Sequence, residues 1–183
     1  KDYIWHGMNF LIQIVRLMIP FHLIGFIHRD LKPENFLIAD IDSKIKMIDF
    51  EFSILPKCRK QCHRWQGTPG YMAPEIQSCQ PSTNKVDIYA FGIIIMDVCA
   101  GLEWETPEQY HEQQLLFKTI RPYELSPLKD ELKPVQSQIH TLVWDCLKQD
   151  PLKRPHFTAI LHRLQTIFYN LQTKKCITRT HSF

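Results

Sequence analysis

The chain carries four polar side chains whose types and spacing suit chemistry on a charged substrate. They are Asp30, Lys32, Asn35 and, fourteen residues after that asparagine, Asp49. A carboxylate accepts the proton of a hydroxyl group, and a lysine neutralises negative charge. Carboxylate and amide oxygens are hard donors that suit a hard cation such as Mg²⁺. Each residue alone is also typical of a polar surface loop, so the surrounding motifs decide between the two interpretations.

The surrounding motifs follow a known order. Residues 28–35 read His-Arg-Asp-Leu-Lys-Pro-Glu-Asn, and residues 49–51 read Asp-Phe-Glu. Residues 67–75 read Gly-Thr-Pro-Gly-Tyr-Met-Ala-Pro-Glu, and further matches lie at residues 87–92 and 150–155. With these five motifs, which cover nearly its whole length, the chain resembles the large lobe of a eukaryotic protein kinase of the serine/threonine type.

The resemblance implies a role for each polar side chain in phosphoryl transfer, which depends on positioning and charge neutralisation. Asp30 is then the base that accepts the proton of the substrate hydroxyl, and Lys32 steadies the phosphoryl group. Asn35 and Asp49 are the implied Mg²⁺ ligands. Thr68 resembles the threonine beside the catalytic aspartate, and both it and Lys32 resemble serine/threonine kinases more than tyrosine kinases.

By the same resemblance, six other residues, Arg29 among them, support the site without reacting. His28 and Phe50 resemble members of a hydrophobic spine that aligns the active site. Asp87 resembles the helix aspartate that anchors the backbone of the catalytic loop. Glu75 and Arg154 resemble a long-range buried ion pair, in which the loss of one partner costs roughly 3–5 kcal/mol.

Hydrophobic periodicity predicts the elements that position these residues. Residues 8–19 are apolar almost all round, which predicts a buried helix with a break or kink at Pro20. The short apolar runs at residues 36–38 and 45–48 predict a small hairpin. The apolar run over residues 86–100 predicts a central helix that is hydrophobic on most sides and ends at a glycine.

The chain lacks the parts of a kinase that hold ATP. It has six glycines and no G-x-G pattern, so neither a glycine-rich phosphate loop nor a Walker A loop is present. Before His28 the only lysine is Lys1, and no glutamate precedes Glu34. The lysine–glutamate pair that orients the nucleotide phosphates in kinases therefore cannot form from this sequence.

The predicted fold is mainly α: a protein kinase-like C-terminal lobe with a small β-hairpin after the catalytic loop. We expect residues 1–172 to form this lobe, with the small lobe absent, and residues 173–183 to form a basic C-terminal tail. The resemblance implies that Leu37 contacts the nucleotide. ATP and Mg²⁺ are expected to bind only when a small lobe is supplied.

Glu51 departs from the family, which usually has glycine at this position. A glutamate stiffens the backbone there and adds a second carboxylate near Asp49. Either this carboxylate faces the site and perturbs Mg²⁺ affinity, or it points to solvent and metal binding survives. The sequence leaves both alternatives open.

Regulation is a further point of departure. In the family, an arginine directly before the catalytic aspartate, as at Arg29, usually implies a basic pocket that binds a phosphorylated activation loop. Between Glu51 and Gly67, however, the only hydroxyl side chain is that of Ser53, and the segment carries four basic residues, Lys57, Arg59, Lys60 and Arg64. We therefore expect no control by phosphorylation in the middle of the loop.

Composition bears on partners and location. The chain has 22 basic and 19 acidic residues, a net charge of +3, which does not favour a nucleic-acid partner. The apolar run over residues 10–27 contains Arg16, Pro20 and His22, which favours a buried helix over a membrane span. Six cysteines without framework spacing suit a reducing compartment, so a cytoplasmic or nuclear location is expected.

Two functions stay open. The first is a partial serine/threonine kinase domain, which transfers the γ-phosphoryl group of ATP to protein hydroxyls when a small lobe completes it. The isolated chain is then inactive. The alternative is a pseudokinase scaffold, or a truncated kinase fragment, that acts only by binding protein partners. The four intact polar side chains favour the first function, and the missing lobe and Glu51 favour the second.

Overall fold

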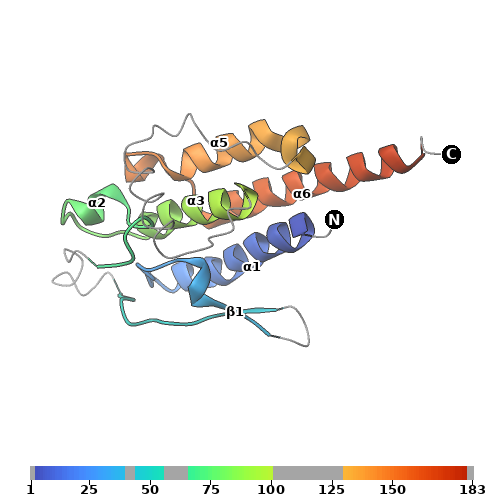
Figure 1. The fold of residues 1–183 in the computed structure, drawn as a ribbon. Coiled ribbons are helices and arrows are strands. Elements are labelled where there is room, and N and C mark those ends of the chain that lie inside the picture. The colour runs from blue at the N-terminus through green and yellow to red at the C-terminus, as the bar shows by residue number, and fades with distance from the viewer. Residues whose placement is uncertain (1–2, 40–43, 56–65, 101–129, 181–183) are drawn as a thin grey trace.

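The computed structural model describes residues 3–39, 44–55, 66–100 and 130–180 (Figure 1). Its α-helices are α1 (Tyr3–Leu23), α2 (Pro74–Gln77), α3 (Lys85–Ala100), α5 (Gln136–Cys146) and α6 (Phe157–Thr180). Its strands are β1 (Phe36–Ile38) and β2 (Ile45–Met47), and its 3₁₀ turns are η1 (Pro33–Asn35), η3 (Asp130–Val135) and η4 (Pro151–Lys153). The described residues are mainly helical with one small sheet, which confirms the predicted fold class.

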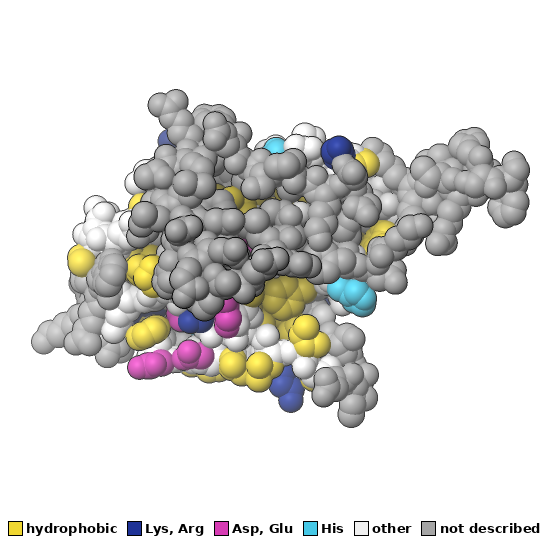
Figure 2. Space-filling view, in the orientation of Figure 1, with side chains coloured by type: hydrophobic (Ala, Val, Ile, Leu, Met, Phe, Trp, Pro, Cys, Tyr) yellow, Lys and Arg dark blue, Asp and Glu magenta, His cyan; other side chains and the backbone are white. Residues whose placement is uncertain are grey.

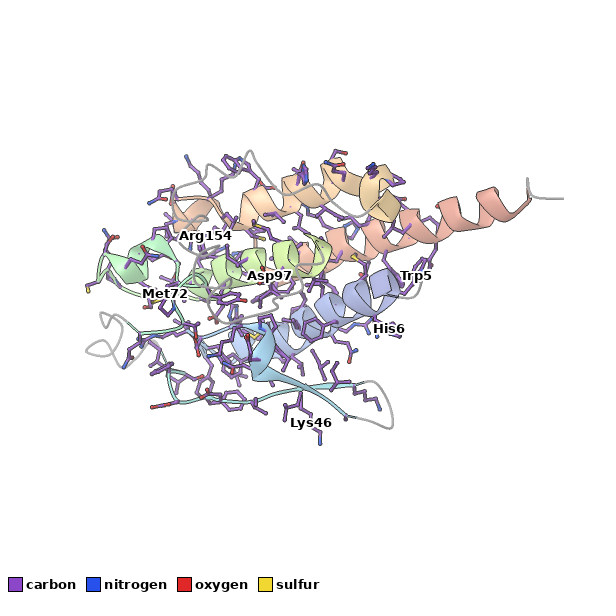
Figure 3. All side chains as sticks on the ribbon, in the orientation of Figure 1. Trp5, His6, Lys46, Met72, Asp97 and Arg154 are labelled. Carbon is purple, nitrogen blue, oxygen red and sulfur yellow. The ribbon has the colours of Figure 1, made fainter. Side chains whose placement is uncertain are left out.

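The helices pack around a main apolar core, and a second, smaller cluster of buried apolar residues includes Ile27, Ile54 and Ile76. Helix α1 contacts both α6 and α3, and α3 contacts α5 on another side (Figure 1). At the N-terminal end of α1, Trp5 packs edge-to-face on Phe168 of α6, with ring centroids 5.1 Å apart (Figure 3). No helix in the described part of the chain is long and apolar enough to span a membrane.

Helix α1 forms because its apolar side chains recur at helical spacing and are fully buried, as at Leu11, Ile14 and Met18. Of the break or kink predicted at Pro20, the break does not occur, since the helix continues past the proline to Leu23, where it ends. Pro20 removes one backbone N–H donor, but it is exposed and its own carbonyl accepts a hydrogen bond from Ile24 N.

The predicted hairpin is confirmed. Strand β1 pairs antiparallel with β2, with Phe36 opposite Met47 and Ile38 opposite Ile45. The hairpin is attached to α1 by an edge-to-face contact between Phe36 and Phe10, whose ring centroids are 6.0 Å apart. A hydrogen bond from Ile45 N to the side chain of α1's Gln13 adds a second attachment, at 3.1 Å.

Helix α3 is the buried centre of the fold, as its apolar sequence predicts, and it ends at Ala100. Its Gly92 permits close packing against α5, because a Cβ atom there would lie 2.8 Å from Cys146 Cβ. Helix α6 runs without a break to Thr180, and therefore across residue 172, after which the basic tail was predicted to begin.

Candidate active site

Asp87 anchors the backbone of the loop that carries the predicted base. Its carboxylate lies in the first turn of α3 and is almost fully buried. Oδ2 accepts a hydrogen bond from His28 N at 2.9 Å, and Oδ1 accepts one from Arg29 N at 2.8 Å. These bonds help hold Arg29 at φ 71°, a conformation that is costly for a residue with a Cβ atom. Buried hydrogen bonds from the backbone of this loop to Asp87 therefore offset the backbone strain at Arg29.

His22 belongs to the same arrangement and was not predicted as a site residue. Its Nε2 lies 2.8 Å from Asp87 Oδ2, and its ring packs on Phe157 with centroids 4.9 Å apart. His22 thus joins the last turn of α1 to the first turns of α3 and α6. A polar residue at the end of an apolar helix was the available signal, but the sequence did not indicate its partner.

Asp30, Lys32 and Thr68 are brought together. Lys32 Nζ donates to Thr68 Oγ1 at 2.9 Å and lies 3.2 Å from Asp30 Oδ2. Thr68 N donates to the other carboxylate oxygen, Asp30 Oδ1, at 2.7 Å. A cation, a carboxylate and a hydroxyl group from two segments of the chain therefore meet at one point.

Gly67 makes this approach of the two segments possible. It has φ 124°, and a Cβ atom at this position would lie 2.8 Å from the backbone oxygen of Arg29. Only glycine meets both conditions without a shift of the backbone. The residue next to it, Thr68, can therefore reach Asp30.

Asn35 and Asp49, the predicted metal ligands, lie on neighbouring segments. Asn35 Nδ2 donates to Asp30 O at 2.8 Å and contacts Asp30 Oδ2 at 3.4 Å. Ile48 N donates to Asn35 O at 2.9 Å, which brings the end of β2 against the loop. Asp49 follows directly, with an exposed side chain and φ 60°. Asn35 thus contacts Asp30 directly, and Asp49 follows the residue that binds the Asn35 backbone.

Glu51 is exposed, and its backbone N–H donates to Asp49 Oδ1 at 3.4 Å. The positive φ in this segment belongs to Asp49, and the described non-glycine residues with positive φ do not include Glu51. A glutamate is therefore accommodated at position 51 without the backbone strain that a glycine would relieve.

The aromatic rings of Phe21, His28 and Phe50 form a cluster beside the loop. The ring of His28 lies 6.1 Å from Phe21 and 5.5 Å from Phe50, centroid to centroid. His28 is fully buried, but Phe50 is 49% exposed. Leu37 and Ile38 of β1 are also exposed, by 53% and 65%. Figure 2 shows apolar and acidic side chains along the lower edge of the molecule, where β1 lies in Figure 1.

Glu75 and Arg154 form the ion pair that the resemblance implies. Arg154 Nη1 and Nη2 donate to the two carboxylate oxygens of Glu75 at 2.6 and 2.8 Å. Lys85 lies beside this pair, and its Nζ donates to the backbone oxygen of Arg154 at 2.6 Å. Burial, and secondly the charge of Arg154, lower the pKa of Lys85.

A buried acid on α3 supports the segment that carries Thr68. Tyr71 OH donates to Asp97 Oδ2 at 2.8 Å. Burial raises the pKa of Asp97 to about 7, the Tyr71 hydrogen bond opposes this shift, and the negative charge of Glu34 adds to it. Asp97 was not predicted as a site residue, because nothing in an apolar helix indicates which residue faces Tyr71.

The chain is similar to known proteins over most of its length. The family described as the protein kinase domain matches residues 5–164. A probable serine/threonine-protein kinase of Dictyostelium discoideum is 37% identical over 156 residues, which cover 85% of this chain and 16% of the relative. A dual specificity protein kinase of the same organism is 34% identical over 164 residues, or 88% of this chain and 20% of the relative.

A plant protein matches in the same way. A serine/threonine/tyrosine-protein kinase of Arabidopsis thaliana is 33% identical over 157 residues, which cover 84% of this chain and 38% of the relative. The chain therefore spans between 16% and 38% of the length of these three relatives. The family match covers well over half of the chain and includes the segments that meet around Asp30. The chain belongs to the protein kinase family.

Proposed function

We propose that this chain is the large-lobe part of a protein serine/threonine kinase. Completed by a small lobe, it transfers the γ-phosphoryl group of ATP to serine and threonine hydroxyls of protein substrates. Without that lobe it is inactive, because it has no lysine–glutamate pair to orient the phosphates of the nucleotide.

The observation that carries this proposal is the meeting of Lys32, Thr68 and Asp30. A hydroxyl group already lies 2.9 Å from Lys32 Nζ, beside the carboxylate of Asp30. A substrate hydroxyl in the same neighbourhood could pass its proton to Asp30 while Lys32 neutralises charge on the phosphoryl group. A cation beside a carboxylate is better suited to transferring a proton while phosphate charge is neutralised than to a purely structural role in the loop.

The side chains fit a magnesium ion that is shared with nucleotide phosphates. Mg²⁺ is usually held by one or two protein oxygen ligands together with phosphate oxygens. Asn35 and Asp49 supply such oxygens on adjoining segments. The described residues contain no group of three His, Cys, Asp or Glu side chains that could hold a metal ion by themselves. When bound, the metal would neutralise phosphate charge during transfer.

Asp30 also has neighbours that orient its carboxylate. Thr68 N binds one oxygen, and Lys32 Nζ and Asn35 Nδ2 approach the other. Orientation before the reaction is what a phosphoryl-transfer site must supply, because the protein contributes little covalent chemistry of its own. The same three residues would therefore set the direction in which a substrate hydroxyl is received.

The test is a fusion protein in which this chain is preceded by the small lobe of the probable serine/threonine-protein kinase of Dictyostelium discoideum. With ATP and Mg²⁺ it is expected to phosphorylate a generic protein substrate on serine and threonine, as phosphoamino-acid analysis would show. Asp30→Asn is expected to lower this rate by about a hundredfold or more, because the proton acceptor is lost. Asp145→Asn, which removes an acid on α5, is the control and is expected to keep activity.

A folded fusion protein that transfers no phosphate, or an Asp30→Asn variant as active as its parent, would refute the kinase proposal. The exposed apolar side chains of Leu37, Ile38 and Phe50 favour the alternative in the first case. Each of them offers apolar surface to a protein partner, so a folded but inactive protein would point to a scaffold.

A further inference from the structure

The guanidinium group of Arg29 is held by a neutral side chain from a distant segment. Arg29 Nη2 donates to Gln66 Oε1 at 2.7 Å, and 37 residues separate the two. Arg29 is only 5% exposed. A short hydrogen bond from a buried cation is among the stronger polar contacts in proteins. The contact is therefore well suited to fix the position of one segment against the other.

Gln66 stands at the start of the segment that reaches the predicted base. The next residue, Gly67, lies against the backbone oxygen of Arg29, and Thr68 N donates to Asp30 Oδ1 at 2.7 Å. Three consecutive residues, 66–68, thus contact Arg29 and Asp30 of the catalytic loop, and Thr68 Oγ1 also accepts from Lys32 Nζ. The Gln66–Arg29 bond joins two side chains that take no part in the predicted proton transfer, so it can be changed without altering the backbone or Asp30, Lys32 and Thr68.

Segments of this kind are often ordered by a phosphate group that pairs with an arginine. In this chain the arginine already has an acceptor that belongs to the polypeptide. Ser53, the only hydroxyl residue between Glu51 and Gly67, has its Oγ 3.5 Å from His28 O. The geometry therefore offers an uncharged, built-in contact at the arginine.

We propose that Gln66 is a positioning residue, which holds residues 66–71 against the catalytic loop through Arg29 and makes an added phosphate unnecessary. The inference rests on the proposed function, because it concerns how the same site stays assembled. It also makes a structural claim that can be tested without any kinase activity.

The experiment measures amide hydrogen exchange by NMR in the 183-residue chain. The probe is Thr68 N–H, and the amides of α3 report global opening. Gln66→Met keeps the length and volume of the side chain but removes the acceptor. Thr68 exchange is expected to rise about tenfold or more, the change that corresponds to one charge-assisted hydrogen bond, while α3 exchange stays unchanged.

Two further variants separate the acceptor from the packing. Gln66→Glu restores an acceptor for Arg29 and is expected to restore slow exchange at Thr68. Gln77→Met is the matched control, because Gln77 Nε2 donates to Met72 O at 3.3 Å in the same region and does not contact the catalytic loop. Gln77→Met is expected to leave Thr68 exchange as it is.

Three outcomes would overturn the proposal. The first is unchanged Thr68 exchange in Gln66→Met, and the second is an equal rise at Thr68 and throughout α3, which would indicate a general loss of stability. The third is faster Thr68 exchange in the unaltered chain after treatment with a broad-specificity phosphatase, since a phosphate would then hold the segment. An inactive fusion protein would refute the kinase function and leave these results interpretable.

Discussion

Arg154 and Glu75 are joined by two hydrogen bonds, 2.6 and 2.8 Å long, although 79 residues separate them in the chain. The side chain of Arg154 is completely buried, and it also donates to the backbone oxygens of Lys148 and Lys85. In Figure 3 it lies near α2, at the end of the helical body opposite Trp5. Both charges are therefore satisfied only while α2, α3 and η4 stay together.

Arg154→Met is expected to destabilise the protein by about 3–5 kcal/mol, because it leaves the Glu75 carboxylate buried without its cation. Urea unfolding at pH 7 measures the change. Arg163→Met is the control, since Arg163 pairs with Asp145 at 2.7 Å but both side chains are about one third exposed. This control is expected to lose less than about 1 kcal/mol. Similar losses in the two variants would contradict the role given to the buried pair.

Asp97→Asn is expected to make stability less dependent on pH. Because burial raises the pKa of Asp97 from 3.8 to about 7, the folded state binds a proton more tightly than the unfolded state. Asp97 therefore lowers stability progressively as pH rises through this window, and its effect is constant above it. The advantage of the variant over the parent should grow from near zero at low pH to about 4 kcal/mol above pH 7, as an upper limit.

Urea unfolding of both proteins at pH 5, 6, 7 and 8 tests this expectation. Asparagine can still accept the hydrogen bond of Tyr71, so the variant removes the titrating group and keeps the contact. Parallel stability curves for the two proteins would show that Asp97 titrates outside the window.

Gly67→Ala is expected to damage the site more than Gly25→Ala. Both glycines have positive φ, 124° and 90°, so each alanine costs about 1–3 kcal/mol of backbone strain. At position 25 the new Cβ meets only Leu55 Cδ2, at 3.9 Å, whereas at position 67 it meets Arg29 O at 2.8 Å. Thr68 exchange should therefore rise well above α3 exchange in Gly67→Ala alone. Equal Thr68 exchange in the two variants would show that the positive φ alone, and not the clash with Arg29 O, explains the effect at position 67.

Replacing two exposed side chains of β1 is expected to reduce the binding of a hydrophobic dye. Leu37→Thr and Ile38→Thr together keep strand propensity and remove apolar surface. Leu152→Thr, at a position that is 86% exposed in η4, is the control for a single exposed leucine away from the hairpin. Dye fluorescence should fall in the double variant and stay near the parent value in the control. No dye binding by the parent chain would contradict an apolar face at the hairpin.

The elements that could be predicted from the sequence are those with a local signal. Helix α3 is apolar on most sides over sixteen residues, and β1 and β2 are short, mainly apolar runs close together in the sequence, so neighbouring residues alone indicate both. Pro20 indicated a break or kink near the end of the first helix, and the helix continues past the proline to Leu23. A proline removes its own N–H donor, but the residue type alone does not show whether the helix stops there or goes on.

For the candidate site, the motifs indicated Asp30, Lys32 and Thr68, and the structure brings their side chains together. The sequence did not indicate His22, Gln66 or Asp97, because each acts through a partner that is far away in the chain. Histidine, glutamine and aspartate are ordinary at exposed positions, so residue type alone could not separate them from surface residues. Only the fold shows that they face Asp87, Arg29 and Tyr71.

The contacts of Asp87 also have a consequence for the order in which the protein folds. The amides of His28 and Arg29 are bound by a carboxylate 58 to 59 residues later in the chain, and Glu75 has its cation 79 residues later. During synthesis the loop that bears Asp30 therefore leaves the ribosome long before the residues that shape it. The contacts that hold this loop can therefore form only after α3 has been made, and the ion pair of Glu75 only after η4 has been made.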